Sequence, residues 1–260
     1  MQAMILGSLQ DYTGTDRVVT SAIRTDPTYS LSYRLLADLY HRQGHDSEAA
    51  ARLRALQSAH PEVAEIYVQL AFIYHERLAD AASYELAYEA NSRLLRLISD
   101  GDPAQVLAAE MNLLECRLTV GRYREVLAKA PELLTRLGDD ADNRLAVHVL
   151  VLAAQVLSRD DRGALKTADE VRRIYNDDFK SSGKWHGWLY DGTLPYVQKH
   201  VAADARMTAL AELIQAINKT SSFREQSGPA PAVSGEVFDR LTAALEARRT
   251  GGSVPVTGTR

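Results

Sequence analysis

Large hydrophobic and small residues alternate with polar ones near the start of the chain in the pattern of a helical hairpin. Apolar positions recur three or four residues apart, which places them on one face of a helix, and a glycine then marks a turn. A second helical stripe follows and stops at a proline, which cannot continue a helix. The pattern is carried by Tyr33, Leu36, Ala37, Tyr40, Gly44, Ala49, Leu53 and Pro61.

The next segment repeats the first half of this hairpin, and two consecutive matches in register are hard to obtain by chance. Its second half is displaced by about seven residues, close to two helical turns, so the buried face is preserved. Because residues 80–88 contain neither Gly nor Pro, we expect longer helices there rather than a loop. The repeated positions are Tyr67, Leu70, Ala71 and Tyr74, followed by Ala90, Leu94, Leu97 and Pro103.

This spacing of large, leucine, small and tyrosine positions resembles the tetratricopeptide repeat (TPR) family. The resemblance covers residues 1–175 and is strongest over 30–74. It implies an all-α fold, a right-handed superhelix of antiparallel helical hairpins that forms a TPR-like α-solenoid. It also implies that the concave face receives a peptide or a helix from a partner protein.

The sequence predicts five regions. Residues 1–175 form the repeat array, with a truncated first unit and about four further units. An aromatic-rich segment and capping helices follow over 176–224, and 225–235, rich in Pro and Gly, is predicted to be a linker. We expect an amphipathic helix at 236–249 and a flexible tail at 250–260.

Composition narrows the functional classes. The hydrophobic content of 46% is enough for a substantial core, and the net charge of −4 offers no basic stripe for nucleic acid. Cys116 is the single cysteine, so we expect neither an intrachain disulfide nor a cysteine-based zinc site. No apolar run approaches the roughly 18 residues of a membrane span. We therefore expect a soluble cytoplasmic protein with no nucleic-acid partner and no membrane span.

The predicted binding groove is lined by residues of the first helix of each unit that face away from the second helix. The mixture of an arginine and two histidines with apolar side chains favours a ligand with an apolar anchor and an acidic or carboxylate group. The alternative is that these residues form an ordinary solvated helix face. The groove residues are Arg34, Asp38, His41, Val68, Phe72, His75, Met111 and Glu115.

The aromatic segment is a secondary candidate site. Trp185, Trp188 and Tyr190, next to Lys184, could stack on a sugar or grip a peptide. The alternative, favoured because large aromatic side chains more often serve core packing, is that these rings close the end of the helical array.

Metal and catalytic motifs are weak. His41 and His45 lie four residues apart but are separated by the helix-ending Gly44, and the His75–Glu76 pair lacks a second histidine four residues after His75. No phosphate-binding loop, nucleophile elbow or dinucleotide fingerprint is present in the sequence. We therefore predict no metal, no cofactor and no catalytic residues.

Together these patterns predict a non-enzymatic interaction module, an adaptor or scaffold, that binds a partner protein or peptide in its groove. The alternative is a helical accessory or substrate-recruiting part of an enzyme system that contacts a glycan or peptide through residues 185–196. Self-association through the terminal repeats is a further expectation.

Overall fold

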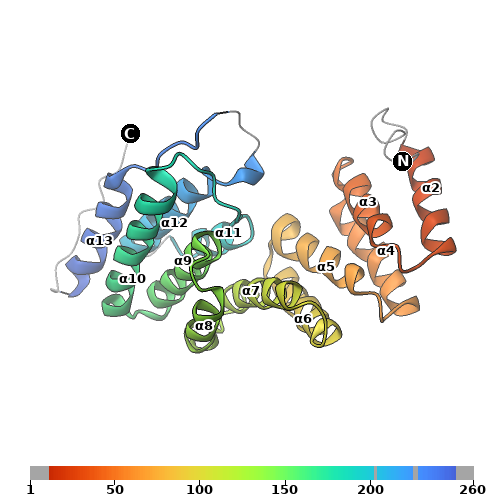
Figure 1. The fold of residues 1–260 in the computed structure, drawn as a ribbon, viewed down its shortest axis with the longest axis horizontal. Helices are drawn as coiled ribbons and strands as arrows, with labels where there is room; N and C mark the ends of the chain where they lie inside the picture. Colours follow the sequence, from red (N-terminus) through yellow and green to blue (C-terminus); the bar gives the residue numbers. More distant parts are fainter. Residues whose placement is uncertain (1–11, 202–203, 225–227, 250–260) are drawn as a thin grey trace. The chain divides into compact units, whose positions relative to one another are not determined.

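The computed structural model describes residues 12–201, 204–224 and 228–249, and its regular structure over these ranges is helical (Figure 1). Within them no strand is formed, and β-type pairing is limited to an isolated bridge between His186 and Ser221. The predicted all-α class is therefore confirmed. None of the described helices is both long enough and apolar enough to cross a membrane.

The chain divides into two compact units, Met1–Cys116 and Arg117–Arg260, with the boundary inside one helix. Unit 1 comprises the helices α2 (Tyr12–Thr25), α3 (Ser30–His41), α4 (Asp46–Ala59), α5 (Ala64–Phe72), the π-helix η1 (Ile73–Leu78), α6 (Ala81–Ile98) and most of α7 (Pro103–Thr119).

The sequence repeat has a structural counterpart in unit 1. The helices α3 and α5 begin 34 residues apart, the period of the tetratricopeptide pattern. The Tyr33 hydroxyl donates to the carbonyl of Pro27 at 2.7 Å, and 34 residues later the Tyr67 hydroxyl donates to the carbonyl of Pro61 at 2.9 Å. Each tyrosine thus fixes the start of its helix to the turn that precedes it.

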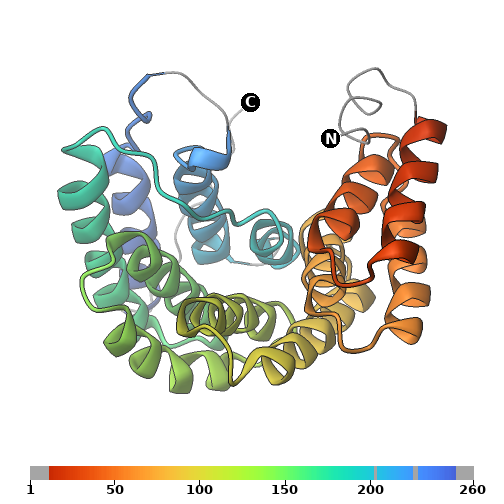
Figure 2. The same cartoon turned by 45° about the vertical axis from the view of Figure 1, so that its right-hand side comes forward.

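The successive helices from α2 to α6 pack against one another along the chain, as the ribbon shows from two directions (Figures 1 and 2). In addition, α3 packs against α5, the corresponding helix of the next hairpin. Ala37 and Ala49 are completely buried, and their small side chains let α3 and α4 approach closely. Leu36 and Leu53, also fully buried, fill the space beside them.

The helix that begins as α5 departs from regular geometry at its C-terminal end. Residues 73–78 form a π-turn, in which the Ala79 amide donates to the carbonyl of Tyr74, five residues back, at 3.2 Å. Ala79 is left-handed, with φ 48°, and ends the helix. Asp80 then caps α6 by accepting from the Ser83 amide at 2.8 Å. The expected long helix across residues 80–88 is present as the first half of α6.

Unit 2 is built on the hairpin of α9 and α10, whose facing sides are almost wholly apolar. The helix α8 packs on α9, while α13 packs on both α10 and α12. Its elements are α8 (Tyr123–Leu137), α9 (Ala141–Ser158), α10 (Asp161–Ile174), the π-helix η2 (Tyr175–Lys180), α11 (Thr193–Gln198), α12 (Ala205–Asn218), the 3-10 turn η4 (Ser222–Arg224) and α13 (Gly235–Arg249).

Residues 228–234, within the predicted linker, are non-helical but held in place. The Tyr175 hydroxyl donates to the carbonyl of Pro231 at 3.2 Å and accepts from the amide of Val233 at 3.0 Å. The helix that follows buries Phe238, Leu241 and Leu245. This contact explains how a helix at the end of a proline-rich stretch joins the core of unit 2.

A cluster of ion pairs around the buried Arg206 joins three helices of unit 2, α10, α12 and α13. Arg206 on α12 is 1% exposed and forms ion pairs with Asp204, the N-cap of the same helix, and with Asp161 at the start of α10. Arg248 of α13 lies 3.9 Å from Asp161 and 4.0 Å from Asp204. These carboxylates balance the charge of the guanidinium, which would be very costly to bury without a partner.

We predict that Arg206→Ala destabilises the protein by about 3–5 kcal/mol, because it leaves Asp161 and Asp204 in a partly buried site without their main partner. The matched control is Arg240→Ala, which removes an exposed pair with Glu212 and should cost about 0–1 kcal/mol. Chemical denaturation followed by circular dichroism measures both. Equal losses for the two variants would show that the buried cluster does not stabilise unit 2.

We also predict that Tyr33→Phe and Tyr67→Phe each lower the free energy of unfolding by about 1 kcal/mol, because each removes one partly buried hydrogen bond and little volume. Tyr29→Phe, at a tyrosine that is 51% exposed, is the control and should leave stability unchanged. Urea unfolding measures the three variants. If the Tyr33 and Tyr67 variants unfold at the wild-type midpoint, the repeated bond contributes nothing.

Candidate functional site

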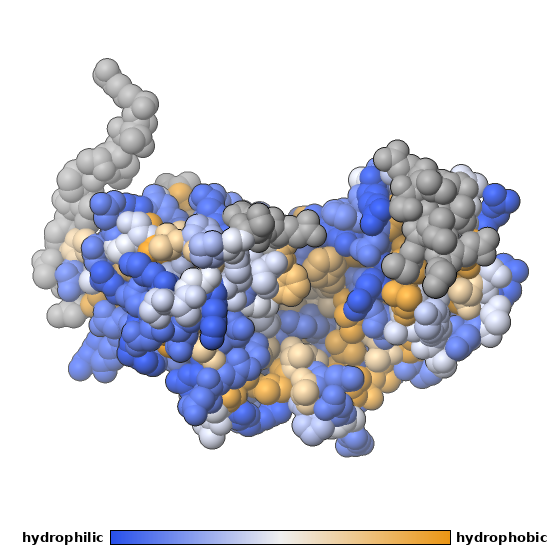
Figure 3. All heavy atoms as spheres, turned by 45° about the horizontal axis from the view of Figure 1, so that its top comes forward, coloured by the Kyte–Doolittle hydropathy of each residue, from blue (hydrophilic) through white to orange (hydrophobic). Residues whose placement is uncertain are grey.

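Five of the predicted groove residues lie on the exposed sides of α3 and α5, which we call the α3–α5 face: Arg34, Asp38, His41, Val68 and Phe72. Val68 and Phe72 are 37% and 43% exposed, unusually open for large apolar side chains. They are four residues apart and so form one apolar stripe. In the space-filling view, hydrophobic patches reach the surface of unit 1 between hydrophilic residues (Figure 3).

An arginine that the sequence reasoning missed organises this face. Arg77 on η1 places its guanidinium carbon 4.9 Å from the centre of the Phe72 ring. It also contacts the carboxylates of Asp38 on α3 and Asp46 on α4, both at 3.3 Å. Asp46 in turn lies 3.1 Å from His41 Nδ1. Arg77 therefore links predicted residues of both helices into one network.

Three of the predicted groove residues do not line an open surface. His75 and Glu115 are each 4% exposed and Met111 is 1% exposed, so the prediction that they line an open groove is wrong. His75 lies in the π-turn and is buried, whereas His41, 34 residues earlier on the regular helix α3, is exposed. Met111 and Glu115 are four residues apart on the buried side of α7.

The inward-turned His75 forms a buried cluster with two carboxylates. Its Nδ1 lies 2.6 Å from Oε1 of Glu76, and Glu115 approaches from α7. One nitrogen or carboxylate oxygen from each residue lies within 4.8 Å of the other two. The Tyr84 ring of α6 packs edge-on against the imidazole, with 5.6 Å between ring centres. The cluster thus joins η1, α6 and α7 inside unit 1.

The electrostatics of this cluster favour bound positive charge. Burial alone would lower the pKa of His75, but the charges of Glu115 and Glu76, and the hydrogen bond with Glu76, outweigh burial and raise it. Burial raises the pKa of Tyr84, and the neighbouring carboxylates of Glu76 and Glu115 raise it further. The two carboxylates therefore favour the protonated form of the imidazole over the neutral form.

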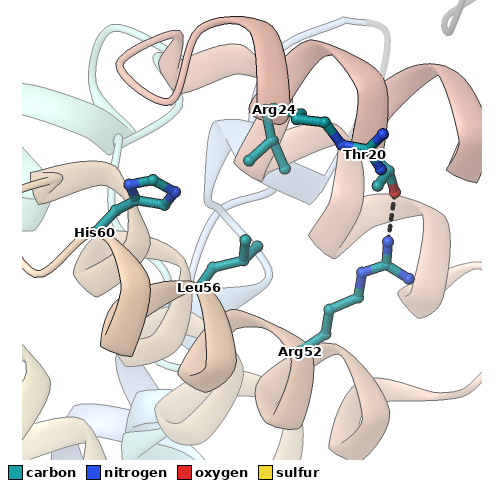
Figure 4. A pocket seen from close by; sticks show the side chains of 6 residues that line it. Thr20, Arg24, Arg52, Leu56 and His60 are labelled. Carbon is teal, nitrogen blue, oxygen red and sulfur yellow. Dashed lines mark hydrogen bonds between the residues drawn. The ribbon is translucent and has the colours of Figure 1, made fainter.

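A separate pocket of about 230 Å³ lies between α2 and α4 (Figure 4). Arg52 reaches across it and contacts Thr20, as the dashed line in the figure shows. The same guanidinium lies 3.1 Å from Asp16 and donates to the Tyr40 hydroxyl at 3.0 Å. These contacts already occupy the Arg52 guanidinium, so it is not the charged group of a ligand site in this pocket. Its lining residues are Thr20, Ile23, Arg24, Arg52, Leu56 and His60.

The aromatic segment of unit 2 is packed onto the end of α12. His186 donates from Nε2 to the carbonyl of Ile217 at 2.8 Å, and its backbone pairs with Thr220 and Ser222. Burial lowers the pKa of this histidine. The Tyr190 amide donates to Asn218 Oδ1 at 3.1 Å.

Of the four residues of the predicted secondary site, Lys184 is exposed, Trp185 and Trp188 are half-buried, and Tyr190 is completely buried. Trp185 donates from Nε1 to the carbonyl of Gly228 at 3.0 Å. The expectation that Tyr190 offers its ring to a ligand is therefore wrong, because its ring fills the interior beside His186, 6.3 Å between centres.

Compared with protein-family models and with curated proteins, the chain matches none.

The raised pKa of His75 predicts how stability depends on pH. The folded protein holds this proton to higher pH than the unfolded chain does, so the stabilisation is complete below the ordinary histidine pKa and is lost as pH rises through the raised value. We expect His75→Gln to cost more free energy of unfolding at about pH 5.5 than at about pH 9.

Glu115→Gln is the matched test of the cause, since it removes a charge that raises the pKa of His75. In that background the pH dependence of the His75→Gln effect should shrink. The comparison is made between variants because His148 and His186, whose pKa values are lowered by burial, contribute with the opposite sign. Urea unfolding across pH measures the effect, and a His75→Gln cost that grows with pH would contradict the assignment.

Proposed function

We propose that this protein is a non-enzymatic interaction module that holds a peptide or helix of a partner protein on the α3–α5 face. The observation that carries the proposal is the exposed apolar pair Val68 and Phe72, four residues apart on one helix. A single exposed apolar residue is common, but a stripe at helical spacing matches the way an amphipathic helix or an extended peptide is bound.

Charged residues next to this stripe indicate what the ligand carries. Arg77 is already paired with Asp38 and Asp46, so its charge is largely balanced. Arg34 is exposed on the same face and has no ion pair among the described residues. It is therefore the guanidinium available to a carboxylate of the ligand, while Phe72 offers the ring that an apolar side chain would cover.

The architecture that we propose is a TPR-like array of helical hairpins in a right-handed solenoid. The 34-residue offset between α3 and α5 and the tyrosine–proline hydrogen bond that recurs with it support this proposal. In such an array the first helix of each hairpin lines the binding side, which is where Arg34, Val68 and Phe72 lie.

A peptide library displayed on phage and selected on the full chain supplies the ligand for the test. We expect the selected peptides to combine an apolar residue with an acidic residue or a C-terminal carboxylate. The double variant Arg34→Ala, Phe72→Ala should bind them about 30-fold more weakly or worse, as expected for the loss of about 2 kcal/mol at a hot spot. Isothermal titration calorimetry measures the affinities.

The control is Phe223→Ala, which removes an aromatic side chain that is 64% exposed in unit 2 and should leave binding unchanged. Thermal unfolding of each variant confirms that it is folded, since Phe72→Ala also removes the ring beside Arg77. If folded Arg34→Ala, Phe72→Ala protein binds the selected peptides with wild-type affinity, the α3–α5 face is not the binding surface.

A further inference from the structure

Three side chains of types that bind metals meet in the interior of unit 1. His75 and Glu76 come from the π-turn that follows α5, and Glu115 comes from α7. One donor atom of each lies within 4.8 Å of the other two. Among the described residues, these three side chains are the ones that meet the geometric requirement for sharing a metal ion, with at least three histidine, cysteine, aspartate or glutamate ligands close together.

Two buried atoms of this cluster lack hydrogen-bond partners. The His75 side chain is 6% exposed, and its Nε2 makes no hydrogen bond; the same is true of Oε2 of Glu76. A buried nitrogen or carboxylate oxygen that makes no hydrogen bond is costly, and such an atom is commonly satisfied by an ordered water or an ion. The cluster thus has donor capacity that the protein itself does not use.

We propose that His75, Glu76 and Glu115 bind one divalent transition-metal cation of the Zn²⁺ type. An imidazole nitrogen with two carboxylates is a three-ligand set used for such ions, and it leaves a coordination position for water. A neutral imidazole and two carboxylates together carry two negative charges, which a divalent cation balances.

The observed positions are close to those that coordination requires. Bonds of about 2.0–2.1 Å place neighbouring ligand atoms of tetrahedral Zn²⁺ roughly 3.3 Å apart. One donor atom of each of the three residues lies within 4.8 Å of the other two, and Nε2 of His75 and Oε2 of Glu76 make no hydrogen bond that a cation would have to break. Side-chain shifts of about 1 Å would convert the hydrogen-bonded cluster into a coordinated one.

The test is a titration of the full chain, freed of metal by a chelator, with Zn²⁺ in a calorimeter at neutral to mildly alkaline pH. We expect one equivalent of Zn²⁺ to bind, and Co²⁺ to give a saturable visible absorption at the same stoichiometry. Glu115→Gln and His75→Gln should each weaken Zn²⁺ binding by about 100-fold or more, since loss of even an outer partner costs 10–100-fold.

The matched control is the double variant His45→Ala, Glu48→Ala. It removes an exposed histidine–glutamate pair with a 3.5 Å separation and should leave the affinity for Zn²⁺ unchanged. Two results would overturn the proposal. One is wild-type protein that shows neither the Zn²⁺ heat at one equivalent nor the Co²⁺ band, a result that depends on no variant. The other is folded Glu115→Gln protein that binds Zn²⁺ as tightly as wild type.

Discussion

The π-turn at residues 73–78 is the constraint on which the candidate sites of unit 1 depend. A π-turn holds one residue more than a regular helical turn, and within this one His75 is buried while Arg77 contacts Asp38 and Asp46. In the preceding hairpin, where α3 is regular, His41 remains on the surface. The same repeat position thus serves a surface pair in one hairpin and a buried cluster in the next.

The π-turn also connects the exposed α3–α5 face with the buried cluster of His75, Glu76 and Glu115. Phe72 stands at the end of α5, directly before the turn, and carries the guanidinium of Arg77 against its ring. Glu76 lies between Arg77 and His75 in the chain and accepts from the histidine. A change in the charge of the buried cluster would therefore act on a helical turn whose side chains also shape the α3–α5 face.

Much of unit 1 could be predicted from the sequence because its signals are local. Gly and Pro mark the hairpin ends, and the spacing of Tyr33, Leu36 and Ala37 identifies a buried face that the structure confirms. The exposure of Val68 and Phe72 followed from the same register. The inward position of His75 could not be predicted, because a π-turn has no clear sequence pattern. Nor could the approach of Glu115, a contact between residues forty positions apart.

The hydrogen bonds from Tyr33 to Pro27 and from Tyr67 to Pro61 have a consequence for how such a chain can grow. Each bond joins a helix to the turn immediately before it, so donor and acceptor are always inherited together. A duplicated segment that begins at one of these prolines and ends just before the next proline would contain both the donor and the acceptor of this hydrogen bond. Gene duplication could therefore lengthen the protein by one hairpin at a time while every helix keeps this hydrogen bond. A duplication whose boundary fell between the proline and the tyrosine would separate the acceptor from its donor.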